Sequence, residues 1–214
     1  MTQDHEQMIE YVAMVIPPKP FDFAALEVQV RRAARQAFKE IASAHPEEQL
    51  CAFALYSDDG AMTVCPSINT TQHLAAMQRQ HPDEAMYYKF ATPEWKYEAT
   101  GADAAFRAIC LNVRTQALAF EGVSKADAKT LAGVSPLRAR PAPRGFATFK
   151  RALFETCLRV LESLRSDRLF AGVTLVFAVS DTDSSARREL AMIKRLNDKA
   201  VVDEFRRWTK TWAQ

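Results

Sequence analysis

Polar side chains gather where the predicted strands end, and these residues have the greatest capacity for chemistry. Asp58 and Asp59 follow the first predicted strand, Asn69 follows the second, and Asp181 and Asp183 follow the third. If these strand ends converge, the carboxylates could bind a divalent cation, orient a basic side chain or share a proton as an acid/base pair. Each residue also has a local alternative, because such side chains serve turns, cap helices or stay solvated. The sequence leaves both interpretations open.

Established signatures of metal, nucleotide and hydrolase sites do not occur in the chain. The four histidines form no HxxxH or HExxH arrangement, so we predict no metal site. There is no GxSxG, P-loop or GxGxxG sequence, and six glycines leave little material for a phosphate cradle. We therefore expect no cofactor. The sequence favours a non-enzymatic protein without deciding the question.

Four cysteines, Cys51, Cys65, Cys110 and Cys157, are scattered among apolar neighbours. Reduced cysteine in such surroundings behaves as a small buried hydrophobe, and this usage indicates a reducing compartment. Cys51 and Cys65 lie in the two strands of one predicted hairpin, where we expect a packed pair of thiols rather than a ligand or redox pair. No export signal or membrane span is expected. The predicted location is the cytoplasm.

Composition favours one globular domain spanning residues 1–214. Hydrophobic residues make up 48% of the 214-residue chain and charged residues 25%, so the chain can bury a sizeable core. A net charge of +2 provides no field that would by itself imply nucleic acid or an anionic membrane.

Charge is nevertheless uneven along the chain. Residues 58–103 hold seven acidic residues against three basic ones, whereas residues 185–214 hold eight basic residues against four acidic ones. Arg138, Arg140 and Arg144 add to the basic set and make nucleic acid a candidate partner. We do not expect that partner, because Trp208 and Trp212 fall at helical spacing and should point into the core rather than stack on bases.

Periodicity predicts the elements that position these residues. Apolar residues at spacings of three and four predict helices over 23–41, 106–120, 146–164, 186–197 and 201–212, and a shorter helical pattern through Leu74 and Met77. Strands are predicted over 50–57 and 61–65, joined by a tight turn in which Gly60 supplies a positive φ, and over 172–179 at the centre of the sheet. Residues 122–145, rich in proline and arginine, should form a mobile loop. The predicted fold class is α+β, with a small, mainly antiparallel sheet packed by several amphipathic helices.

Several short sequence motifs occur in a characteristic order along the chain. They are Phe53 to Asp59, Asn69-Thr70, Glu94-Trp95-Lys96-Tyr97-Glu98, Val179 to Asp183 and Arg195-Leu196-Asn197. Together they resemble the bacterial family known as domain of unknown function 4303, over about residues 23–205. The family has no established activity. Compact bacterial families of this kind often look like immunity proteins that bind and block a toxin, so the resemblance implies a protein-binding role.

Two functional hypotheses follow. The first is a non-enzymatic immunity protein that binds a cognate toxin, with an acidic patch at Asp58, Asp59, Glu94 and Glu98 steering a basic partner. Its predicted binding residues are Asp58, Asp59, Asn69, Glu94, Trp95, Tyr97, Glu98, Asp181 and Asp183. The alternative is an enzyme or small-ligand sensor with a carboxylate-lined site at the strand ends, using Asp58, Asn69, Glu98, Asp181 and Asp183.

Overall fold

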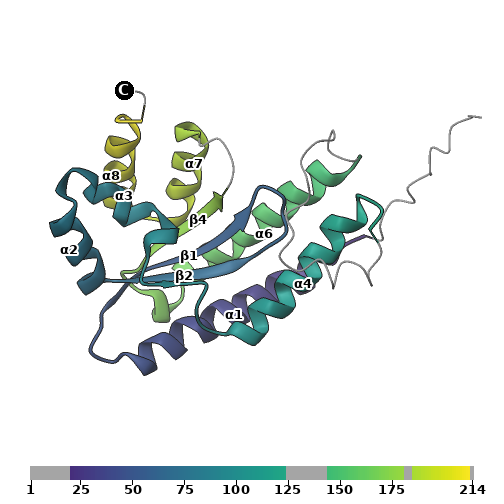
Figure 1. The fold of residues 1–214 in the computed structure, drawn as a ribbon, viewed down its shortest axis with the longest axis horizontal. Coiled ribbons are helices and arrows are strands. Elements are labelled where there is room, and N and C mark those ends of the chain that lie inside the picture. Colours follow the sequence, from purple (N-terminus) through teal and green to yellow (C-terminus); the bar gives the residue numbers. More distant parts are fainter. Residues whose placement is uncertain (1–19, 124–143, 181–184, 213–214) are drawn as a thin grey trace, which may run out of the picture.

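A four-stranded sheet lies between two layers of helices (Figure 1). The computed structural model describes residues 20–123, 144–180 and 185–212. The elements in chain order are α1 (Phe23–Ala44), β1 (Leu50–Asp58), β2 (Cys65–Thr70), α2 (Thr71–Gln80), η1 (Pro82–Glu84), α3 (Ala85–Phe90), η2 (Thr92–Glu94), β3 (Tyr97–Glu98), α4 (Asp103–Ala119), α6 (Phe146–Arg165), η3 (Arg168–Phe170), β4 (Thr174–Ser180), α7 (Ala186–Leu196) and α8 (Lys199–Thr209). Most of the predicted loop at 122–145 lies outside the described residues.

The sheet has the strand order β3-β2-β1-β4 and is mixed. β2 pairs with β1 and with β3 in antiparallel fashion, whereas β4 pairs with β1 in parallel. The predicted α+β class is confirmed, and the parallel pair shows that the sheet is not purely antiparallel. The predicted central position of the third strand is wrong, because β4 forms an edge of the sheet and β1 lies inside it. β4 is apolar because helices cover both of its faces.

Alternate residues of β1 point into two separate cores, as the two-residue period of a strand requires. Phe53 and Leu55 belong to the larger core, which α1, α4 and α6 cover. Ala52 and Ala54 belong to the smaller one, which α3, α7 and α8 cover. Figure 1 shows these two helical layers on opposite sides of β1 and β2. The small alanine side chains allow the second layer to approach the sheet closely.

Helix starts follow the capping signals of the sequence. The Asp22 carboxylate accepts a hydrogen bond from the Ala25 N–H at 2.8 Å and caps the start of α1. Thr70 caps α2 through the His73 N–H, so Asn69 is not the capping residue. At η2 the N-cap is Ala91, and Thr92 is buried inside the turn. The helices predicted from periodicity are confirmed at α1, α2, α4, α6, α7 and α8.

The connection between β1 and β2 is wider than predicted. β2 begins at Cys65, so the predicted strand over 61–65 is wrong. The positive φ, 53°, falls on Ala61 rather than on Gly60. Ala61 is fully buried, and its packing holds a backbone conformation that would otherwise favour glycine.

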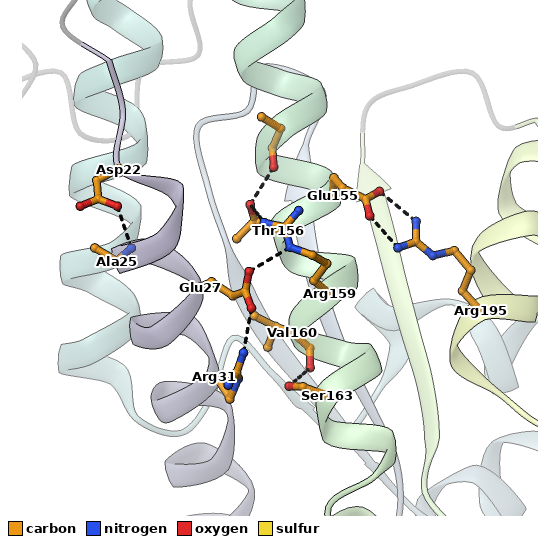
Figure 2. A network of polar contacts seen from close by, with 11 residues as sticks. Asp22, Ala25, Glu27, Arg31, Glu155, Thr156, Arg159, Val160, Ser163 and Arg195 are labelled. Atoms are coloured by element: carbon orange, nitrogen blue, oxygen red, sulfur yellow. Dashed lines mark hydrogen bonds and ion pairs between the residues drawn. The ribbon is translucent and has the colours of Figure 1, made fainter.

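Ion pairs join the helices of the scaffold (Figure 2). The Glu27 carboxylate of α1 contacts Arg31 on its own helix at 2.8 Å and Arg159 of α6 at 2.9 Å. Arg195 of α7 contacts Glu155 of α6 at 2.6 Å. These pairs tie α6 to a neighbour on either side.

No helix in the described ranges is both long enough and apolar enough to span a bilayer.

Candidate functional site

Asp58 organises the loop that follows β1. Its carboxylate accepts hydrogen bonds from the Met62 N–H at 3.1 Å and from the Thr63 hydroxyl at 2.6 Å. Its carbonyl oxygen accepts the Ala61 N–H at 3.0 Å. The side chain is half-buried and closes the loop on itself. Asp58 therefore has a clear local role of the kind that aspartate commonly plays in turns.

Asp59 connects the same loop to α6. Its carboxylate lies 2.7 Å from the Lys150 ammonium, which also donates to the Asp59 carbonyl oxygen at 3.1 Å. The Asp59 N–H donates to the carbonyl oxygen of Ser180 at the end of β4, 3.1 Å away. The carboxyl ends of β1 and β4 thus meet, as parallel pairing requires. Asp181 and Asp183 follow this edge but lie outside the described residues.

Asn69 lies at the opposite end of the β1–β2 pair. It is opposite Ala52, six positions before Asp58, and this spacing corresponds to roughly 20 Å along a strand. Its side chain is 1% exposed and accepts the Thr70 N–H at 3.0 Å. Asp58 and Asn69 therefore do not line one site. Among the described residues, no group of three His, Cys, Asp or Glu side chains could hold a metal ion.

Trp95 belongs to the smaller core. Its side chain is 3% exposed and packs with Ala52 and Phe90. The indole Nε1 is buried and has no hydrogen-bond partner within the described part of the chain. Trp95 cannot touch a partner protein without rearrangement.

Tyr97 and Glu98 form the short edge strand β3. The Tyr97 ring stacks on His45 at 4.9 Å between centroids, and its hydroxyl donates to Glu48 at 2.8 Å. The exposed Glu98 carboxylate accepts the Tyr56 hydroxyl from β1. Burial, together with this carboxylate, raises the pKa of Tyr56, so the phenol stays protonated. Glu98 is accessible, whereas Tyr97 is only half-exposed.

Sequence reasoning missed the surface formed by α2 and α3, which we call the α2–α3 surface: Leu74, Met77, Glu84, Tyr87, Tyr88 and Glu94. α2 has no buried residue although it carries Leu74 and Met77. Tyr87 is 40% exposed and is one of the few exposed large apolar side chains in the described residues. The consecutive tyrosines offered a signal, because successive helical positions point about 100° apart and cannot both face one core.

Unpaired acidic groups surround these tyrosines. Glu84 and Glu94 are exposed, and the Tyr87 hydroxyl donates to Glu94 at 3.2 Å. The nearby lysines are engaged elsewhere, Lys89 with Glu204 and Lys96 with Glu48. In the described structure neither Glu84 nor Glu94 forms an ion pair of its own. The α2–α3 surface therefore presents negative charge beside the exposed ring of Tyr87 and the half-exposed ring of Tyr88.

The tyrosine hydroxyls of this surface remain hydrogen-bond donors. Burial raises the pKa of Tyr87, and the charges of Glu94 and Glu84 raise it further. The same influences raise the pKa of Tyr88. Both phenols are protonated at neutral pH, so they donate while the carboxylates accept. Such a surface can bind arginine or lysine side chains and apolar groups at the same time.

At the basic C-terminal end, the aromatic rings of the described residues are not available to stack on the bases of a nucleic acid. Trp208 stacks on Phe90 at 5.8 Å between centroids and meets Phe205 edge to face at 5.5 Å. Trp212 packs against Trp208 at 4.9 Å. These rings pack on the smaller core, as their spacing predicted, and do not form a platform for bases.

Comparison with known proteins places the chain in a family. The family model described as a domain of unknown function (DUF4303) matches residues 30–198. No curated protein and no solved structure matches significantly. The matched range begins within α1 and ends after α7, so it covers all four strands. The chain belongs to the DUF4303 family.

Proposed function

We propose that this protein is a non-enzymatic binding domain that neutralises a cognate bacterial toxin, and that the α2–α3 surface contacts a basic region of that toxin. The observation that carries the proposal is the position of Tyr87, an exposed aromatic side chain beside the unneutralised Glu84 and Glu94. Tyrosine is enriched at the centres of protein interfaces and among the residues that dominate binding energy.

Electrostatics supports a basic partner. Charge complementarity at the rim of an interface raises association rates, and it suppresses partners of the same sign. The exposed Glu98 on β3 extends the acidic character beyond the α2–α3 surface. We expect association to slow as salt is added, because exposed charges are screened over about 10 Å at 0.1 M ionic strength.

The half-exposed apolar residues of α2 support the same role. A helix that contributes no buried residue to its own fold gains from being covered by a partner. Leu74 and Met77 provide half-exposed apolar area on α2, which packs against α3, and methionine adapts its shape to different partners. We place the protein in the cytoplasm, where four free cysteines are compatible with reducing conditions.

The alternative site of strand-end carboxylates receives less support. Asp58 is used in its own loop and Asn69 lies roughly 20 Å away by strand spacing. A catalytic or ligand-sensing site built from these residues would need them to line one cavity. We therefore put the binding role first.

Co-expression with the product of the adjacent gene tests the proposal. If that product arrests growth, the wild-type chain should restore growth and co-purify with it. A Tyr87→Ala, Glu94→Lys variant should lose both effects. Leu111→Ala is the matched control, because Leu111 is a similarly exposed apolar residue, 38% exposed, on α4 of the other helical layer.

Two outcomes would overturn the assignment. If the neighbouring product is harmless, or remains toxic in the presence of this protein, the immunity function is wrong. If protection occurs but is lost equally in the Leu111→Ala variant, the contact surface is not the one proposed. Thermal unfolding of each variant separates lost binding from lost folding.

A further inference from the structure

Two cysteines from distant parts of the chain meet beside the edge of the sheet. Cys65 opens β2, and Cys110 lies in the middle of α4. Their sulfur atoms are 3.8 Å apart, in van der Waals contact. This is not the predicted pair, because Cys51 is at the other end of β1, where the register places Asn69 and Thr70. Both residues of the contacting pair are partly exposed.

Backbone groups hold the Cys110 sulfur in place. The Val64 N–H donates to it across 3.4 Å, and its S–H can donate to the Val64 carbonyl oxygen across 3.2 Å. Val64 precedes β2, and β3 pairs only with Ser67 and Ile68, so the backbone at Val64 lies beyond the paired edge. Cys110 takes the place of a strand there. The sulfur is therefore fixed next to Cys65 rather than free to rotate away.

The surroundings favour a thiolate on Cys110. A hydrogen bond from the Cys65 thiol lowers the pKa of Cys110 below the ordinary value for a thiol, and the Val64 N–H and the charge of Arg114 act in the same direction. The hydrogen bond to Cys110 and burial raise the pKa of Cys65. One thiol is thus poised as a nucleophile while its neighbour keeps its proton, which is the division of roles found in redox-active pairs.

We propose that Cys65 and Cys110 form a redox-active dithiol that a hydroperoxide oxidises to an intramolecular disulfide. In the first step the Cys110 thiolate attacks the terminal peroxide oxygen, the O–O bond breaks, and an alcohol or water leaves with one added proton. Cys110 is then a sulfenic acid. In the second step the Cys65 sulfur attacks the Cys110 sulfur, and its proton leaves with the hydroxyl group as water. Two thiols have lost two electrons, and the peroxide has gained them.

The other cysteines lack this arrangement. Cys157 is fully buried in the larger core, and burial raises its pKa to about 12. Burial also raises the pKa of Cys51, whose thiol hydrogen-bonds with Thr71, and no contact of Cys51 with another cysteine sulfur occurs in the described structure. Oxidation should therefore be specific for one pair. Disulfides in reducing compartments are usually transient and redox-sensing, and a partly exposed dithiol fits that use.

Peroxide titration of the full-length protein tests the proposal. Stoichiometric hydrogen peroxide should remove two free thiols, lower the intact mass by two hydrogen atoms and yield a Cys65–Cys110 cross-linked peptide after proteolysis. Dithiothreitol should reverse all three changes. Cys51→Ser is the matched control and should react like wild type.

Single variants assign the two roles. Cys65→Ser should trap a sulfenic acid on Cys110 that labels with dimedone, whereas Cys110→Ser should react at least tenfold more slowly than wild type. The alkylation rate of wild-type Cys110 should reach half its maximum at a lower pH than the rate of an ordinary cysteine thiol, whose pKa is about 8.5, and this measurement does not depend on any variant folding. A cross-link to another cysteine, or equal peroxide rates in wild type and Cys110→Ser, would overturn the proposal.

Discussion

The side-chain amide of Asn197 forms a pair of hydrogen bonds with the backbone of Leu175. Asn197 Oδ1 accepts the Leu175 N–H at 2.9 Å, and Nδ2 donates to the Leu175 carbonyl oxygen at 2.7 Å. Leu175 lies on the edge strand β4, so the amide takes the place that a further strand would occupy. The same Nδ2 also donates to the Ile193 carbonyl oxygen at 3.2 Å. Asn197 thus protects a sheet edge and closes the end of α7.

Replacing Asn197 with alanine should be strongly destabilising. The variant leaves the N–H and carbonyl groups of Leu175 without partners in a buried setting, at about 1–3 kcal/mol for each unsatisfied group. We expect a total loss of about 2–6 kcal/mol in the free energy of unfolding, measured by urea denaturation. Asn112→Ala on the exposed face of α4 is the control and should change stability by less than about 0.5 kcal/mol. An equal effect of the two substitutions would contradict this role.

Much of the fold could be predicted because its helices are long and strongly periodic. The apolar stripe of α1 and the aspartate before it identify both the helix and its start. The position of β4 could not be predicted. A strand with apolar residues on both faces is typical of the centre of a sheet. β4 is instead an edge strand, and the side chain of Asn197, twenty-two residues further along, hydrogen-bonds its free backbone groups at Leu175.

The polar residues of the candidate site were harder to assign than the helices. Asp58 and Asn69 both follow predicted strands. In an antiparallel pair, however, the carboxyl ends of the two strands lie at opposite ends of the pair. Tyr87 escaped notice because its exposure depends on how α3 packs, which periodicity over six residues cannot determine. The Cys65–Cys110 contact joins residues that no local pattern relates.

Gly101 should not tolerate alanine. Its φ is +93°, and an added Cβ would lie 3.0 Å from both Cα and Cβ of Ala37 on α1. Backbone strain and overpacking each cost about 1–3 kcal/mol, so Gly101→Ala should lose about 2–6 kcal/mol in the free energy of unfolding. Gly122→Ala is the control, since Gly122 also has a positive φ, +77°, but nothing lies within 4 Å of the added atom. It should lose only about 1 kcal/mol, and comparable losses in urea titrations would show that the contact with Ala37 does not matter.

The ion pair of Arg195 with Glu155 should make the free energy of unfolding depend on pH. The Arg195 guanidinium contacts both oxygens of Glu155, at 2.6 and 2.9 Å, and lowers the pKa of that carboxyl below its ordinary value of 4.5. A lowered pKa in the folded state adds stability above the unfolded pKa, and that stability disappears as the pH falls through the folded pKa. Because both side chains are more than a third exposed, Arg195→Met should cost only about 1 kcal/mol at neutral pH.

The pH profile is the informative measurement for this pair. The difference in unfolding free energy between wild type and Arg195→Met should be constant from about pH 6 to 8 and shrink below about pH 4.5. Lys194→Met, at an exposed position on the same helix, should show no such trend. A difference that stays constant down to about pH 3 would mean that Glu155 gains nothing from Arg195.

Substitutions of Trp95 distinguish a role in the smaller core from a role in binding a partner. The buried indole N–H has no partner in the described structure, so phenylalanine removes an unfavourable buried donor while it keeps one aromatic ring. The side-chain volume lost with the indole lowers stability and so opposes this gain. We expect Trp95→Phe to change the free energy of unfolding by less than about 1.5 kcal/mol, whereas Trp95→Ala should lower it by about 3–5 kcal/mol. Binding to the proposed toxin partner, measured by co-purification, should survive in Trp95→Phe and fail in Tyr87→Ala. If Trp95→Phe instead loses binding at unchanged stability, Trp95 must reach the partner, and the smaller core must open when the complex forms.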